Sequence, residues 1–133
     1  MSRRRARKQA FLTLYQSDVT GVGLDSILAR WRHYKGDLEE YAETLARGVE
    51  RDRLDLDERI GSAAEGWKVN RMNAVDRTIM RLALYEMLNV GDVPPEVAIN
   101  EAVELAKGFS SEEAPSFVGG VLRGASRELI GHG

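Results

Sequence analysis

Five cations stand close together at the start of the sequence, and their spacing points to phosphate binding. They are Arg3, Arg4, Arg5, Arg7 and Lys8. The first turn of a helix favours anions, so exposed cations there cost on the order of 0.3–1 kcal/mol each. The phosphate oxygens of RNA or DNA would offset this cost. Two other interpretations of these cations stay open: they belong to a solvated, frayed terminus, or they make an electrostatic contact with the rest of the chain.

The rest of the chain is acidic, which makes the basic start more conspicuous. The whole sequence of 133 residues has a net charge of −2, with 19 Lys and Arg against 21 Asp and Glu. Without the five N-terminal cations, 14 cations face 21 anions, and the net charge is −7. We therefore expect an acidic body with a basic tip.

Composition favours a globular protein of the reducing cytoplasm. The sequence is 43% hydrophobic and 30% charged, which is typical of a folded domain. The absence of Cys excludes disulfides and thiolate metal sites. No apolar run is long enough for a membrane span, and no apolar segment follows the N-terminal charges as in a signal peptide.

Residue patterns give catalysis little support. His33 and His132 are far apart and belong to no metal-binding spacing. The Gly21-Val22-Gly23 sequence follows no predicted strand and indicates only a turn. We expect a protein that is not an enzyme and that holds no metal and no cofactor.

Two helices in the middle of the chain must position these residues. Apolar residues cover most of the circumference of a helix over residues 75–90, which predicts a central, buried helix. Asn73 suits its N-cap, and Asp76 suits its first turn, where the helix dipole favours an acid. A two-faced helix over residues 95–109 follows, with Pro95 at its first position. Together they predict a core hairpin.

Glu86 is an acid on the apolar side of the central helix. A buried carboxylate needs hydrogen-bond partners. Backbone N–H groups or a nearby Arg would supply them, in which case Glu86 braces the turn into the next helix. The alternative is that Glu86 binds a protein partner directly.

Helical periodicity extends over the remaining segments, and no strand-like alternation of useful length appears. One arc of residues 3–17 is apolar and also carries Arg3 and Arg7. A short helix is expected from about Asp25, and a longer one over residues 38–60, where the pattern leaves open whether Gly48 and the charges at 51–57 bend or split it. Residues 110–115 suggest a polar loop. The last predicted helix, at 116–130, contains Gly119, Gly120 and Gly124, which would permit close approach of a neighbour.

Several runs of residues resemble the NusB family of transcription antitermination factors. They are Asp76-Arg77, Arg81-Leu82-Ala83-Leu84-Tyr85-Glu86, Val93-Pro94, Val97-Ala98-Ile99-Asn100-Glu101-Ala102-Val103-Glu104-Leu105-Ala106-Lys107, Phe117-Val118, Gly120-Val121-Leu122, and the opening Arg3-Arg4-Arg5-Ala6-Arg7 with Leu14-Tyr15. The resemblance implies an all-α, NusB-like fold of about seven helices in two small packed bundles. It also implies a single domain over 1–133, divided into subdomains at about 1–66 and 67–133.

The resemblance implies a non-enzymatic RNA-binding factor. Such a factor pairs with the small-subunit ribosomal protein NusE, binds single-stranded boxA-type RNA, and joins the transcription elongation complex to promote rRNA synthesis. Phe117 matches a residue beside which RNA bases stack, although core packing would also explain it. Tyr15 and Asp76 match the family's protein-partner face, although Tyr15 also suits the core and Asp76 the helix dipole.

The sequence departs from the family pattern beside Phe117. Gly119-Gly120 stands where the family usually has Asn-Gly, and Ser116 where a basic residue is common. Both departures replace a longer polar side chain by a shorter one near the predicted RNA surface. Two alternatives follow: an accessory module of an RNA-modifying system, or a structural homodimer that hides its basic tip.

Overall fold

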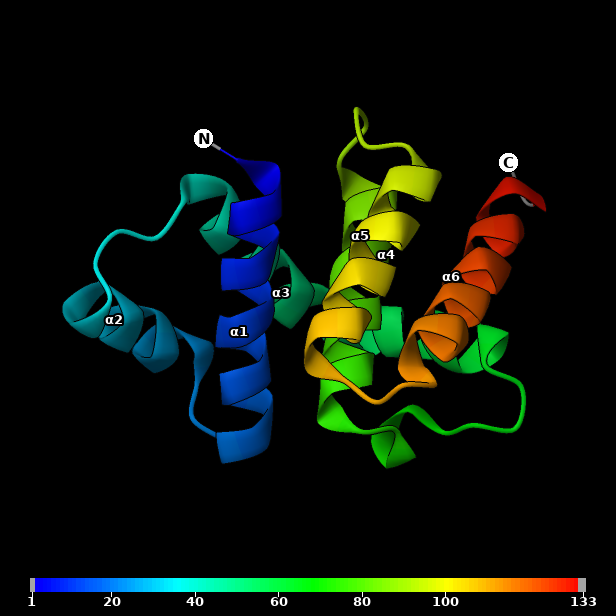
Figure 1. Cartoon of the computed structure of the whole chain (residues 1–133), viewed down its shortest axis with the longest axis horizontal. Coiled ribbons are helices and arrows are strands. Elements are labelled where there is room, and N and C mark those ends of the chain that lie inside the picture. The colour runs from blue at the N-terminus through cyan, green and yellow to red at the C-terminus, as the bar shows by residue number, and fades with distance from the viewer. Residues whose placement is uncertain (1, 132–133) are drawn as a thin grey trace.

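A computed structural model describes residues 2–131, and His132 lies outside this range. Within it the chain forms six α-helices and one short 3-10 helix, with no strand (Figure 1). The α-helices are α1 (Arg3–Thr20), α2 (Leu24–Tyr34), α3 (Glu40–Ala63), α4 (Ala74–Asn89), α5 (Pro95–Phe109) and α6 (Ala114–Gly131), and the 3-10 helix η1 (Val69–Arg71) precedes α4. The prediction of an all-α fold with about seven helices is confirmed.

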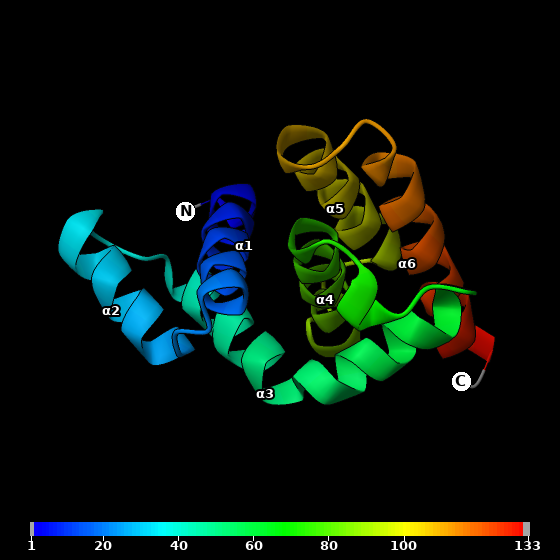
Figure 2. The ribbon, with the colours of Figure 1, turned by 90° about the horizontal axis from the view of Figure 1, so that it is seen from below.

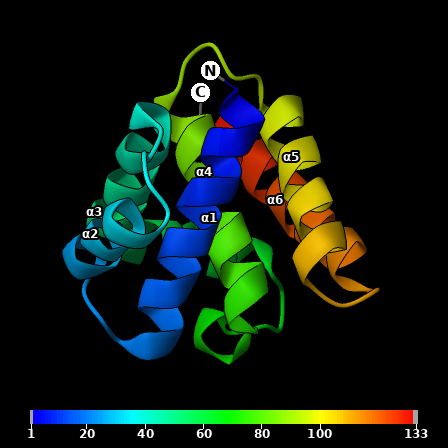
Figure 3. The same cartoon turned by 60° about the vertical axis from the view of Figure 1, so that its left-hand side comes forward.

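Helix α4 lies at the centre, as its sequence predicts. It packs against α1, α3, α5 and α6, and Figure 3 shows it behind α1 with α5 alongside. Its middle is buried around the whole circumference, including Ile79, Met80, Leu82 and Leu84. Asn73 caps it, because the side-chain oxygen accepts a 2.8 Å hydrogen bond from the backbone N–H of Asp76.

Helix α3 extends below both halves of the molecule (Figure 2). It packs against α1 and α2 near its start, and against α4 and α6 along its length. One hydrophobic cluster includes residues from all six α-helices. The subdomain boundary near residue 66 stays a prediction.

Gly48 does not split α3, which continues as one helix from Glu40 to Ala63, although Figure 2 shows that its path is bent. The side chain of Tyr85, from α4, lies on the backbone of Gly48, where any Cβ atom would overlap the tyrosine ring. Gly48 therefore allows α3 and α4 to approach each other closely.

Two helix boundaries differ from the predicted ones. Helix α1 extends beyond Ser17 to Thr20 and ends at Gly21, whose φ of 74° is left-handed. Helix α6 begins at Ala114, so Pro115 lies in its first turn, where a missing N–H costs nothing. No helix among the described residues is both long and apolar enough to cross a membrane.

Candidate nucleic-acid interface

A buried ion pair fixes the basic start of α1 to the core. The Arg7 Nε atom donates to both carboxylate oxygens of Glu86, at 2.8 and 3.0 Å. The hydroxyl group of Tyr41 donates to the same carboxylate at 2.5 Å. Arg7 is 6% exposed and Glu86 only 1%. Each charge is therefore satisfied beneath the surface, which gives both residues a positioning role.

This environment changes the pKa of Tyr41. Burial, followed by the hydrogen bond to the Glu86 carboxylate and its negative charge, raises the pKa of Tyr41 well above its ordinary value near 10. The tyrosine therefore stays protonated and keeps donating to Glu86 through the neutral pH range.

Arg3 and Arg4 make ion pairs at the surface with the α4–α5 turn and with α5. The Arg3 guanidinium lies 3.3 Å from the Asp92 carboxylate and 4.7 Å from the centre of the Tyr41 ring. Arg4 lies 3.1 Å from Glu101. Exposed pairs of this kind contribute roughly 0–1 kcal/mol, so a phosphate group can compete for these arginines.

Arg5 and Lys8 are exposed and line a groove between α1 and α5, here called the tip groove. Its volume is about 480 Å³, and its lining residues are Ser2, Arg4, Arg5, Arg7, Lys8, Glu101, Glu104, Leu105 and Phe109. Within the described part of the chain, neither Arg5 nor Lys8 forms an ion pair with an acid. The tip groove thus offers a polyanion cations along one wall and an aromatic ring among its lining residues.

Phe109 supplies that ring, and the sequence did not single it out. It packs against Phe11 at 5.0 Å between ring centres, yet remains 41% exposed, and the Lys8 ammonium lies 5.8 Å from its centre. Its position on the apolar arc of α5 predicts only core packing. The available signal was its place at the helix end, where a core residue emerges at the surface.

A second groove lies at the start of α6 and holds two more of the predicted residues. Phe117 is half-buried and packs edge-on against Trp67 with 5.6 Å between ring centres. The groove has a volume of about 330 Å³ and is lined by Trp67, Arg71, Met72, Asn73, Asp76, Ser111, Glu113, Ala114 and Phe117. Trp67 is 58% exposed and adds aromatic surface that the sequence assigned only to a connection.

The carboxylate of Asp76 accepts hydrogen bonds from other side chains of the protein. Its carboxylate accepts from the Ser110 hydroxyl at 2.6 Å and from the Asn73 amide at 3.1 Å, and its side chain is buried. These bonds attach the start of α4 to the loop before α6. Tyr15 is half-buried and stacks on Phe11, with 6.0 Å between ring centres.

The predicted RNA-contacting residues do not form one compact patch. In Figures 1 and 3 the first turn of α1 lies at the top of the molecule, whereas the first turn of α6 lies in the lower half beside the end of α5. The basic tip and the helix turn that carries Phe117 are therefore separate. Phe109, at the end of α5, is exposed aromatic surface on the way from one to the other.

The described residues contain no group of three or more His, Asp or Glu side chains that could hold a metal ion. The grooves instead present arginine, lysine and aromatic side chains, which are the groups that bind nucleic-acid backbones and bases.

The fold and grooves define the class: a small, all-helical protein whose surface grooves carry the side chains that bind nucleic acids. The model of the NusB family matches residues 4–127. A transcription antitermination protein NusB from Rubrobacter xylanophilus is 69% identical over 131 residues, covering 98% of this chain and 94% of the relative. The chain belongs to the NusB family of transcription antitermination factors, which are not enzymes.

Solved structures agree with this assignment. NusB of T. maritima matches with a TM-score of 0.86 at 33% identity, covering 96% of this chain and 92% of that one. A structure of the antitermination factors NusB and NusE in complex with dsRNA matches with a TM-score of 0.84 at 28% identity, covering 96% and 99%.

Proposed function

We propose that this protein acts in the cytoplasm as the RNA-binding partner of ribosomal protein NusE in the transcription elongation complex. The pair would bind boxA-type RNA and promote processive transcription of rRNA operons. The observation that carries the proposal is the tip groove, whose exposed cations are held in place by the buried pair of Arg7 and Glu86. The solved complex of a NusB relative with NusE and dsRNA supports both partners.

Separate roles follow for the residues of the tip. Arg5 and Lys8 contact phosphates directly, whereas Arg3 and Arg4 exchange their surface acids for phosphates when RNA arrives. Arg7 does not contact RNA but holds the first turns of α1 at the correct angle. Phe117 and Trp67 provide a stacking surface for an unpaired base, and Tyr15 with the Asp76 region faces NusE.

Fluorescence anisotropy of a labelled boxA-type RNA tests the proposal. RNA would be titrated as a single strand and as a duplex, with and without NusE, at several salt concentrations. A variant with Arg4→Ala, Arg5→Ala and Lys8→Ala would be compared with a control that loses three cations of α2 and α3, Arg30→Ala, Arg53→Ala and Arg59→Ala.

We expect NusE to tighten RNA binding and the tip variant to lose it, while the control keeps most of it. For a single strand, the salt slope should decrease by about 0.7 for each phosphate contact removed. Light scattering on the same samples reports whether RNA binds a monomer or a homodimer. A protein that binds neither the RNA nor NusE, alone or together, contradicts the proposal.

A further inference from the structure

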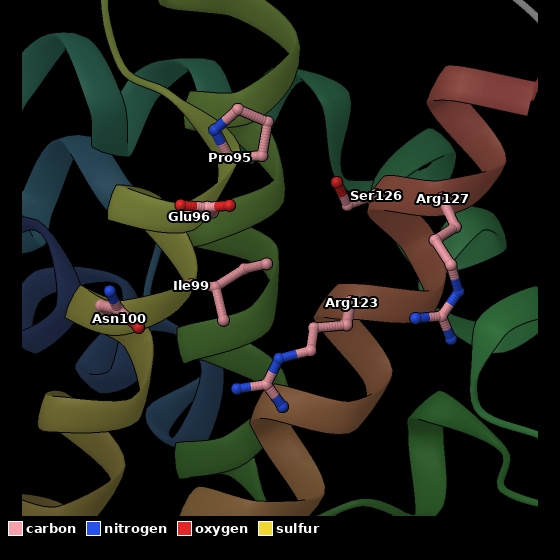
Figure 4. A pocket seen from close by; sticks show the side chains of 7 residues that line it. All are labelled: Pro95, Glu96, Ile99, Asn100, Arg123, Ser126 and Arg127. Atoms are coloured by element: carbon pink, nitrogen blue, oxygen red, sulfur yellow. The ribbon is translucent and has the colours of Figure 1, made fainter.

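A third groove, between α5 and α6, has features that the tip groove does not explain. Figure 4 shows its two walls: Glu96, Ile99 and Asn100 on α5, and Arg123 and Arg127 on α6. Its volume is about 370 Å³. We call it the α5–α6 groove.

Arg123 and Arg127 occupy one wall without an acidic partner. Both are exposed, and within the described residues neither guanidinium lies within ion-pair distance of a carboxylate. They are one helical turn apart, so their like charges destabilise α6 slightly. Neither lies in the last turn, where the helix dipole would favour a cation. The pair therefore weakens the isolated helix, and a bound anion would reverse that effect.

Gly119 leaves space for the guanidinium group of Arg123. A Cβ atom at this position would lie 3.2 Å from Nη1 of Arg123 and 3.3 Å from Cγ2 of Val103. The guanidinium therefore lies back over the bare backbone of the preceding turn. Gly119 is the residue at which this sequence departs from the Asn of the family pattern, and the departure makes room for a cation.

The start of α5 adjoins both the tip and the α5–α6 groove, which Pro95 and Glu96 help to line. Asp92, just before α5, pairs with Arg3 of the tip. The first turns of α5 expose Pro94, Pro95 and Val97, so Glu96 is the one exposed carboxylate there. The N-terminus of a helix also favours an anion. A polyanion that leaves the tip and crosses the start of α5, a helix diameter of about 10–12 Å, passes the carboxylates of Asp92 and Glu96 before it reaches the two arginines of α6.

We propose that the α5–α6 groove binds phosphate groups of the RNA that leaves the tip groove, through the guanidinium groups of Arg123 and Arg127. Each planar guanidinium can donate two parallel hydrogen bonds to a phosphate, which lysine cannot. The inference rests on the proposed RNA-binding function and extends the path of the RNA across α5. It adds a phosphate contact outside the tip groove.

The test compares two labelled single-stranded RNAs. One carries only the boxA-type sequence, and the other carries about ten additional uridines at each end, enough to pass a further binding groove. A variant with Arg123→Gln and Arg127→Gln is measured against a control with Arg30→Gln and Arg59→Gln, which has the same net charge. Circular dichroism confirms that both variants are folded.

We expect the groove variant to bind the extended RNA roughly tenfold more weakly than the control and with a salt slope smaller by about 1.4, or 0.7 for each phosphate. Binding of the short RNA should be equal for both. A charge-preserving variant, Gly119→Asn, should displace Arg123 and also weaken binding of the extended RNA alone.

Equal binding of the extended RNA by the groove variant and the control overturns this inference while leaving the tip as an RNA site. If wild type binds neither RNA, the proposed function fails together with it. The two failures are therefore distinct.

Discussion

At the scale of single residues, the organising feature is a carboxylate that the protein buries almost completely. Glu86 is 1% exposed, and Arg7 and Tyr41 both donate hydrogen bonds to its carboxylate oxygens. The three residues come from α4, α1 and α3, so one carboxylate connects three helices. A buried charge tolerates the removal of its partner poorly, because the remaining charge is left without compensation.

Glu86→Gln should therefore destabilise the protein by about 3 kcal/mol, because Arg7 keeps its charge in a buried site without an opposite charge. Urea unfolding followed by circular dichroism measures this, with the exposed Glu58→Gln as the matched control. Replacing both partners, Arg7→Met with Glu86→Met, should recover part of the loss. A double variant less stable than Glu86→Gln would refute the explanation by an uncompensated charge.

Tyr41 should make the stability of the protein depend on alkaline pH. Its pKa is raised in the folded state above the unfolded value near 10, so the stabilisation is complete below pH 10. As the pH rises above 10, the unfolded chain loses this proton first, and the free energy of unfolding falls. Urea unfolding from pH 8 to 11.5 should show a steeper decline for wild type than for Tyr41→Phe. Equal slopes would contradict this assignment.

The buried pair of Arg7 and Glu86 could be predicted from the sequence, whereas the role of Tyr41 could not. Helical angles place Glu86 on the apolar side of α4 and Arg7 on the apolar arc of α1, and two opposite charges that both face a core predict a buried pair. Grouping Arg7 with its exposed neighbours obscured that pattern. Tyr41 could not be assigned in advance, because periodicity does not reveal which side chain of α3 reaches the carboxylate.

At the scale of elements, the glycines differ in what they do. Periodicity placed the six α-helices but not the 3-10 helix η1, and Asn73 and Pro95 located two helix starts. It could not show why residue 48 is a glycine, because the answer depends on Tyr85 of another helix. Within α6, Gly119 adjoins Val103 and Arg123, whereas Gly120 has no neighbour within 4 Å of where a Cβ would stand.

Two alanine substitutions should therefore have opposite effects. Gly120→Ala should stabilise the protein by about 0.5–1 kcal/mol, because alanine favours the helix and meets no obstacle. Gly48→Ala should destabilise it by roughly 1–3 kcal/mol, because the new methyl group must displace the Tyr85 ring. Thermal unfolding should show a higher Tm for the first and a lower Tm for the second. Removal of the ring by Tyr85→Leu should reduce the effect of Gly48→Ala, and an unchanged effect would contradict the proposed overlap.

At the scale of the whole molecule, charge is distributed so that acids pair with two cations of the basic tip. Composition predicted an acidic body and a basic tip, but not the tip groove, which lies between α1 and α5. Glu101 of α5 lies beside Arg4, and Asp92 of the α4–α5 turn lies beside Arg3. The five cations are therefore unequal: one is buried against Glu86 of α4, two are paired at the surface, and two are exposed.

This arrangement predicts that removing an acid strengthens RNA binding. Glu101→Gln should raise the affinity for single-stranded RNA roughly two- to fivefold, since an exposed ion pair of up to about 1 kcal/mol no longer competes for Arg4. The effect should be largest at low salt, where charges are screened least. Glu58→Gln makes the same change in net charge on α3, away from the groove, and should alter the affinity much less. Anisotropy titrations at several salt concentrations compare the two variants. Equal gains would mean that RNA responds only to the net charge of the body, whereas a gain confined to Glu101→Gln would mean that this acid regulates access to the tip groove.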